Sequence, residues 1–405
     1  MLRRILVLLA FATMLPLAGP APAQDREDNA SIARMAIEAE DDKGFLTRFL
    51  QSRLSGAGRT VQIDGFEGAL SSRATFARIT IADAEGNWLV LHDGAIQWTR
   101  SALLRGRVEI GELSAALIEI PRLPKSEEAT DQPRAEARSF NLPELPVGIN
   151  IEKISAPQVV LGSPVLGEDA TLSLSGAMSL EGGEGTADVV INRTDGKKGD
   201  FVFKGGFDNT SRVLNIDLTL DEAPDGIFSR FARIEGQPAV AATIKGAGPL
   251  DDFLGEAQIA TDGVDRVTGK LAMTGEKGPD GADGASFDLE VGGDLSTLLP
   301  PQNREFFGTS THILAKGWRG YNGQLDITTL NLDTDALKID GRLSVNDQGA
   351  PQLVDLQVDF GQQAGAATLP VKIPFVDPPI TVLSGELAVG LDVCGDSCGS
   401  EKTKA

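Results

Sequence analysis

Most of the sequence after about residue 60 alternates apolar and polar residues with a period of two, and this restricts the possible folds more than any other feature. The stretch 214–220, which reads LNIDLTL, is the most regular example. Alternation places one row of side chains on each face of a β-strand. Clusters of Gly, Asp and Asn interrupt the alternating runs, as hairpin turns do, at residues 83–87, 181–185, 195–196 and 280–284. The pattern predicts a mainly β chain, folded as an elongated, twisted, mostly antiparallel sheet.

Such a sheet has one apolar face along many strands. That face must pack on another sheet, close into a barrel or remain available to a ligand. A taco-like hydrophobic groove is the third solution, and it is the one we expect. The candidate groove residues, taken from the alternating runs, are Ile79, Ile81, Trp98, Ile110, Phe201, Phe203, Ile216, Leu218, Ile339 and Val358.

The first residues have the pattern of a secretory signal. Arg3 and Arg4 precede an apolar run, and the run ends in the small-residue tripeptide Ala21-Pro22-Ala23. Residues 1–23 are therefore either a cleaved signal peptide or an uncleaved inner-membrane anchor. Both readings predict a periplasmic protein, either free or attached to the inner membrane.

The rest of the chain divides by composition and periodicity. Residues 24–58 have helical spacing and are predicted to form a helical cap, with an amphipathic segment that touches a membrane or partner as the alternative. A first β segment (59–124), a Pro- and Glu-rich loop (125–146), a long β segment (147–393) and a tail (394–405) follow. Short helices are expected at 225–234, 250–254 and 295–307.

The composition argues against several classes of function. With 37 basic and 58 acidic residues, the formal net charge of −21 disfavours nucleic acid as a partner. No hydrolase or zincin motif is present, and two histidines offer little for catalysis or metal binding. The phosphate-loop-like residues 263–270 have the wrong spacing, and the loop 278–284 lacks the ligand spacing of a calcium site. We expect no enzyme, no metal and no cofactor.

Cys394 and Cys398 lie close together near the C-terminus. Two further metal ligands are missing nearby, and the spacing differs from a redox Cys-x-x-Cys motif. Outside the cytoplasm a local disulfide is expected, and two unlinked thiols are the alternative.

The sequence resembles the translocation and assembly module family, TamB, within the AsmA-like group. The similarity begins at Gly65-Phe66-Glu67-Gly68 and continues through a strand, an Asp-x-x-Gly-x-Trp turn and a strand that ends in Trp98. Further similar segments are 102–106, 119–122, 234–238, 246–253, 306–308 and 337–343. Family members are longer and have a C-terminal domain, so we expect this chain to correspond to their N-terminal portion, as a truncated gene product, a split subunit or a short paralogue.

The resemblance implies a bridge-type lipid-transfer protein with a hydrophobic β-groove. The implied partners are phospholipid, the inner membrane and an outer-membrane β-barrel assembly protein, and the implied roles are phospholipid transport and outer-membrane protein assembly. Two other classes remain as alternatives: a secreted β-solenoid enzyme acting on polysaccharide, and a β-sandwich scaffold or adhesin. An aromatic content of 5% and a single Tyr disfavour the polysaccharide enzyme.

Overall fold

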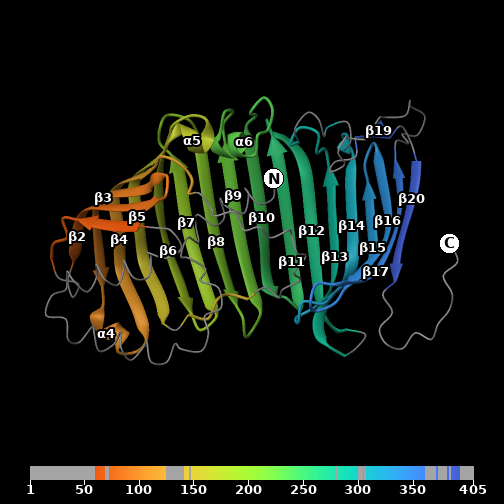
Figure 1. The fold of residues 1–405 in the computed structure, drawn as a ribbon, viewed down its shortest axis with the longest axis horizontal. Coiled ribbons are helices and arrows are strands. Elements are labelled where there is room, and N and C mark those ends of the chain that lie inside the picture. Colours follow the sequence, from red (N-terminus) through yellow and green to blue (C-terminus); the bar gives the residue numbers. More distant parts are fainter. Residues whose placement is uncertain are drawn as a thin grey trace. The chain divides into compact units, whose positions relative to one another are not determined.

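The structure is a computed structural model. It describes residues 60–68, 73–124, 141–145, 147–278, 281–299, 304, 307–360, 371–372, 381–382 and 385–392. The predicted signal segment 1–23, the predicted helical cap 24–58, Cys394 and Cys398 lie outside the described residues. The prediction of a mainly β chain is confirmed, because strands dominate the described sequence (Figure 1).

The described residues form two compact units. The first contains those up to Arg233 together with Gln237–Ala241, and the second contains Ile234–Gly236 and those from Ala242 onward. This division falls inside the segment 147–393, which the sequence predicts as one long β segment.

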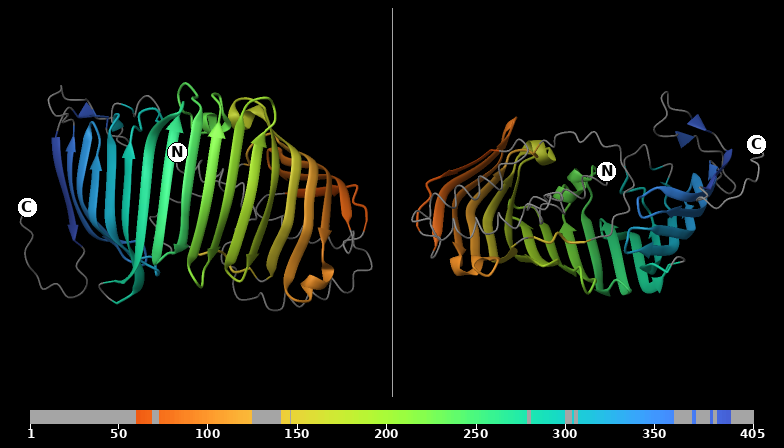
Figure 2. Two further views of the ribbon diagram at one scale, coloured as in Figure 1. Left: turned by 180° about the vertical axis from the view of Figure 1, so that it is seen from behind. Right: turned by 60° about the horizontal axis from the view of Figure 1, so that its bottom comes forward.

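The first unit is a sheet in which sequence neighbours pair. Its strands are β1 (Thr60–Asp64), β2 (Ala74–Asp83), β3 (Gly86–Trp98), β4 (Arg107–Ile120), β5 (Gly148–Leu161), β6 (Ala170–Glu181), β7 (Glu184–Arg193), β8 (Gly199–Asp208) and β9 (Val213–Glu222). Three short helices accompany them: α4 (Arg100–Leu103), α5 (Ser163–Leu166) and α6 (Ile227–Phe231). Figure 2 shows α5 and α6 at one end of the strands and α4 at the other.

One pair of strands departs from the mostly antiparallel pattern. β4 and β5 are parallel, with Arg107 opposite Gly148 and Ile120 opposite Leu161. A parallel pair needs a long crossover, because the chain must return to the end where it started. The connection from Pro121 to Val147 links the two strands, and it contains the whole of the Pro- and Glu-rich segment 125–146. The sheet is therefore mixed.

The second unit contains a further series of strands, the first of which, β10, begins with two residues that belong to the first unit. They are β10 (Val240–Pro249), β11 (Asp252–Thr261), β12 (Val264–Lys277), β13 (Asp283–Gly293), β14 (Thr311–Gly320), β15 (Leu325–Asp333), β16 (Leu337–Val345), β17 (Pro351–Phe360) and β20 (Gly385–Asp392), with a separate two-stranded pair, β18 (Val371–Lys372) and β19 (Thr381–Val382). From β11 to β17 each strand pairs antiparallel with the next, and β17 pairs with β20.

The predicted turns fall between strands as expected. In the β6–β7 hairpin, Gly182 and Gly183 have φ angles of 58° and 82°. Two consecutive positive φ values define the type I′ turn that suits a two-residue hairpin, and glycine adopts them without a steric penalty.

The predicted helices have mixed outcomes. The helix expected at 225–234 is present as α6. The helix expected at 250–254 is wrong, because β11 already begins at Asp252 and Phe253 pairs with Met273. Within 295–307, residues 296–298 form a turn and residues 304 and 307 are helical, while 300–303 and 305–306 lie outside the described residues. The short helices α4 and α5 were not predicted.

Candidate functional site

The site that the sequence predicts is an apolar sheet face, and β6 shows it most clearly in the first unit. This strand alternates without interruption, so its apolar side chains share one face while Ser173, Ser175 and Ser179 take the other. The apolar set is Ala170, Leu172, Leu174, Met178 and Leu180, with Gly176 between them.

Residues that lie directly opposite each other on neighbouring strands extend this face across the sheet, in rows that run perpendicular to the strands. The longest row crosses seven strands, from β3 to β9: Trp98, Ile110, Ile151, Met178, Ala187, Gly205 and Ile216. A second row runs from β2 to β6: Ile79, Leu91, Ile118, Val159 and Leu172. We call the surface made of these rows, together with the other residues on the same side of each strand, the apolar face of the first unit.

Irregularities in β5 keep its apolar residues on this face. The pairing of β5 with β6 shifts twice, between Ile151 and Ile154 and between Ala156 and Val159. At each shift two consecutive exposed residues, instead of one, separate neighbouring apolar residues of β5. Such β-bulges re-aim the side chains that follow them. Without them, half of the strand would turn its apolar side chains to the opposite face.

All eight candidates in the first unit lie on this apolar face. Trp98, Ile110 and Ile216 belong to the longest row, and Ile79 belongs to the second, with Ile81 two residues along the same strand. Phe203 is directly opposite Leu218, and Phe201 is opposite Leu220. Trp98 and Leu218 are buried, at 6% and 8% exposure, and the other six are half-buried.

The remaining two candidates belong to the second unit. Ile339 of β16 is directly opposite Val358 of β17, and Leu332 of β15 is opposite Ile339. The same row continues through Ile313 of β14 to Val291 of β13. The second unit therefore has an apolar sheet face of its own, built by the same alternation.

The opposite faces of both sheets are polar, and their charges are paired across strands. Cross-strand ion pairs join Lys204 to Asp188 at 3.5 Å in the first unit and Arg342 to Asp355 at 3.0 Å in the second. Further pairs are Lys270–Glu256 and Lys316–Asp288. Exposed pairs of this kind contribute little stability, but they keep this face hydrated.

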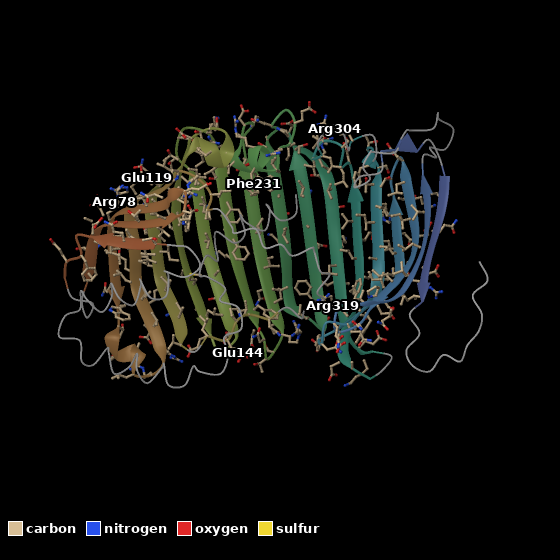
Figure 3. All side chains as sticks on the ribbon, viewed as in Figure 1. Arg78, Glu119, Glu144, Phe231, Arg304 and Arg319 are labelled. Carbon is tan, nitrogen blue, oxygen red and sulfur yellow. The ribbon has the colours of Figure 1, made fainter. Side chains whose placement is uncertain are left out.

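One end of the apolar face in the first unit is covered by α5 and α6. Leu166 of α5 packs in a buried cluster with Leu161, Ala170 and Leu172, and Ile227 and Phe231 of α6 pack against this cluster. Figure 3 places Phe231 at this end of the strands and Glu144 at the opposite end.

A charged network fixes α5 and α6 in this position. The Arg193 side chain is only 2% exposed, and its guanidinium contacts Glu168 at 3.1 Å and Asp195 at 2.8 Å. Glu168 also pairs with Lys197 at 3.0 Å and with Arg230 of α6 at 3.1 Å. Because Glu168 lies two residues after the end of α5, it links both helices to the end of β7.

The carboxyl groups of this network have shifted pKa values. Burial raises the pKa of Glu168, but hydrogen bonds from Lys197 and Arg193 outweigh burial, and the net pKa is lowered. The hydrogen bond from Arg193 lowers the pKa of Asp195. Burial raises the pKa of Glu222, whose Oε2 accepts a 2.8 Å hydrogen bond from the backbone N–H of Phe228 in α6.

The other end of the apolar face is covered by part of the connection between β4 and β5. The backbone N–H of Leu142 donates to Oδ1 of Asn209 at 2.7 Å, and Nδ2 of Asn209 donates to the carbonyl of Leu142 at 2.8 Å. The Leu142 side chain lies directly over Gly185, where an added Cβ would be 2.8 Å from Leu142 Cδ1. Gly185 belongs to the apolar face, so Leu142 covers this face beside the turn between β6 and β7, while its backbone is held by the turn between β8 and β9.

The described residues contain few other groups suited to catalysis or metal binding. His92 pairs with Glu119 at 2.6 Å and His312 with Glu290 at 3.3 Å, each across neighbouring strands. Within the described ranges there is no cluster of three or more His, Cys, Asp or Glu residues that could hold a metal ion. None of the helices in those ranges is long and apolar enough to span a bilayer.

A cavity of about 570 Å³ lies on the polar face of β12–β15. Its lining includes Trp318, whose indole N–H donates to the carbonyl of Glu276 at 2.8 Å, and the ion pair of Lys316 with Asp288. The cavity lies outside the predicted apolar residues.

Comparison of the sequence with models of protein families gave no match, and neither curated proteins nor solved structures matched it. The resemblance to TamB therefore depends on the sequence segments alone.

Proposed function

We propose that the protein is an envelope lipid carrier of the TamB-like, AsmA-like kind, whose apolar sheet face holds phospholipid acyl chains. The observation that supports this most strongly is the row from Trp98 to Ile216, in which seven successive strands place apolar residues or glycine side by side. A continuous apolar surface of this extent is unusual on a soluble sheet unless a partner or ligand uses it.

The dimensions of the face suit acyl chains. Nine neighbouring strands at about 4.8 Å spacing make a sheet roughly 40 Å wide. An acyl chain spans half of a bilayer core that is about 30 Å thick, or roughly 15 Å. A phospholipid tail therefore fits wholly on the face. The coverings at the two ends, α5 with α6 and Leu142, favour tails that lie between them.

The resemblance extends the proposal to cellular context. We infer a periplasmic protein near the inner membrane, which passes lipid toward the outer membrane or supports the assembly of outer-membrane proteins with a β-barrel partner. The antiparallel ladders support this class over a β-solenoid enzyme, since β-helices are built from parallel strands.

Lipid co-extraction tests the proposal. The full chain is purified in a detergent exchanged for amphipol, and bound phospholipid is quantified by mass spectrometry. Ile216→Asp, on the apolar face, should reduce bound phospholipid severalfold, whereas Thr219→Asp, exposed on the polar face of the same strand, should retain it. Equal phospholipid in both variants, or none in the unsubstituted chain, would remove the basis of the proposal and favour a scaffold.

A further inference from the structure

The turn between β3 and β4 presents a leucine to solvent on a tip that backbone hydrogen bonds close. The N–H of Ala102 donates to the carbonyl of Thr99 at 3.0 Å, and the N–H of Arg105 donates to the carbonyl of Ala102 at 2.9 Å. Ala102 is fully buried, whereas Leu104 is 68% exposed. The single helical turn α4 thus anchors the tip inward through Ala102 and holds Leu104 outward.

The same tip is locally basic in an acidic protein. Residues 99–107 read TRSALLRGR, with three arginines and no carboxylate, while the whole chain has a net charge of −21. Arg107 is neutralised at the base of the tip by Glu181, 2.7 Å away. Arg105 lies 3.8 Å from Glu109, and its side chain remains 59% exposed. Leu104 and Arg105 are therefore adjacent and both point into solvent.

We propose that this tip docks on the surface of a bilayer that contains anionic phospholipid. Leu104 enters the boundary between headgroups and acyl chains, and Arg105 pairs with lipid phosphate. An exposed apolar side chain next to a basic residue has the composition of interfacial anchors. A stable protein interface needs about 800 Å² from each partner, which a single helical turn cannot supply. A bilayer accepts one projecting side chain, so membrane fits the tip better than protein does.

The chain offers a matched comparison. Leu254 is 69% exposed, as much as Leu104, but it lies within β11 on the polar face, directly opposite Ala272 and two residues from Glu256. A side chain in the middle of a strand cannot enter a bilayer unless the surrounding charged sheet face is dehydrated as well. Exposure is thus equal at the two leucines, and only the shape and charge of their surroundings differ.

The test is a depth-sensitive fluorescence measurement on the full chain. Leu104→Trp and Leu254→Trp are each mixed with vesicles of phosphatidylcholine and phosphatidylglycerol that carry nitroxide-labelled acyl chains. After subtraction of the three native tryptophans, the emission from position 104 should shift to shorter wavelength and be quenched at least twofold. Emission from position 254 should do neither. Because the signal is local, contact of other segments with the vesicle does not produce it.

Two further arms complete the test. Arg105→Gln should weaken the quenching at position 104 severalfold on anionic vesicles, and equal quenching on purely zwitterionic vesicles would overturn the role of Arg105. In the unsubstituted chain, vesicles should slow amide exchange at residues 103–106. Absence of quenching at position 104 with unchanged exchange, or equal quenching at both positions, would overturn the proposal. Docking of the tip on a bilayer does not depend on acyl-chain binding by the sheet face. An experiment can therefore refute either proposal without refuting the other.

Discussion

Leu218→Asp is expected to destabilise the first unit strongly, because Leu218 is 8% exposed and directly opposes Phe203 on the apolar face. Removing a buried leucine side chain costs about 2 to 5 kcal/mol. Placing an unpaired carboxylate in the same site adds about 1 to 3 kcal/mol. The expected loss is therefore about 4 kcal/mol or more.

Thr219→Asp is the matched control. It adds the same carboxylate to the next residue, which is exposed on the opposite face. Exposed substitutions usually change stability by about 0.5 kcal/mol or less, and the nearby Asp217 and Asp221 add only weak repulsion.

Thermal unfolding monitored by circular dichroism compares the two variants. For a unit of this size, about 4 kcal/mol corresponds to a fall of roughly 10 °C in Tm for Leu218→Asp. Thr219→Asp should melt within about 2 °C of the unsubstituted chain on the same scale. If both variants lose the same stability, or if Leu218→Asp loses none, the assignment of faces in β9 is wrong.

Three other substitutions test the two ends of the apolar face. Arg193→Met leaves Glu168 without its buried partner and should cost about 3 kcal/mol in urea unfolding, whereas an unchanged midpoint would show that the network is not buried in solution. Since burial raises the folded pKa of Glu222, the stability from its protonated form is present below the unfolded pKa and is lost as pH rises through the folded pKa. Glu222→Gln should flatten that fall in a series of melts across acidic to neutral pH, and an identical pH profile would contradict the assigned shift. Asn209→Ala removes both hydrogen bonds to Leu142 and should speed proteolysis near residue 142 severalfold, and an unchanged cleavage rate would show that this clasp contributes nothing.

The period-two pattern predicted which residues share a face because alternation is a local property of each strand. All eight candidates in the first unit lie on one face, although they come from five strands. The pattern in 214–220 is read directly as β9, with Ile216 and Leu218 on the apolar side. Hairpin turns were also visible, since glycine and acidic residues mark them locally.

Features that depend on distant parts of the chain were not predictable in the same way. The parallel pairing of β4 with β5 is decided by the path of a long connection, which alternation does not report. The bulges in β5 do have a local sequence signal, since the pairs Glu152-Lys153 and Pro157-Gln158 interrupt the alternation of apolar residues at the two shifts.

The charged network around Arg193 was missed for a related reason. Its members come from β7, from the turn after β7, from the segment after α5 and from α6, and in the sequence they look like any other surface charges. Only burial distinguishes them: the Arg193 side chain is 2% exposed, whereas that of Lys204, one strand away, is 63% exposed. The helix predicted at 250–254 failed because a short apolar run fits a strand as well as a helix.

Site-specific photocrosslinking tests the central claim most directly. A benzophenone amino acid replaces Phe203 on the apolar face, and in a second variant it replaces Val202, the preceding residue on the opposite face. After illumination of the full chain with native membranes, mass spectrometry should find phospholipid attached through an acyl chain at position 203 and little or none at position 202. Equal attachment at both positions, or none at position 203, would contradict acyl-chain binding by the apolar face.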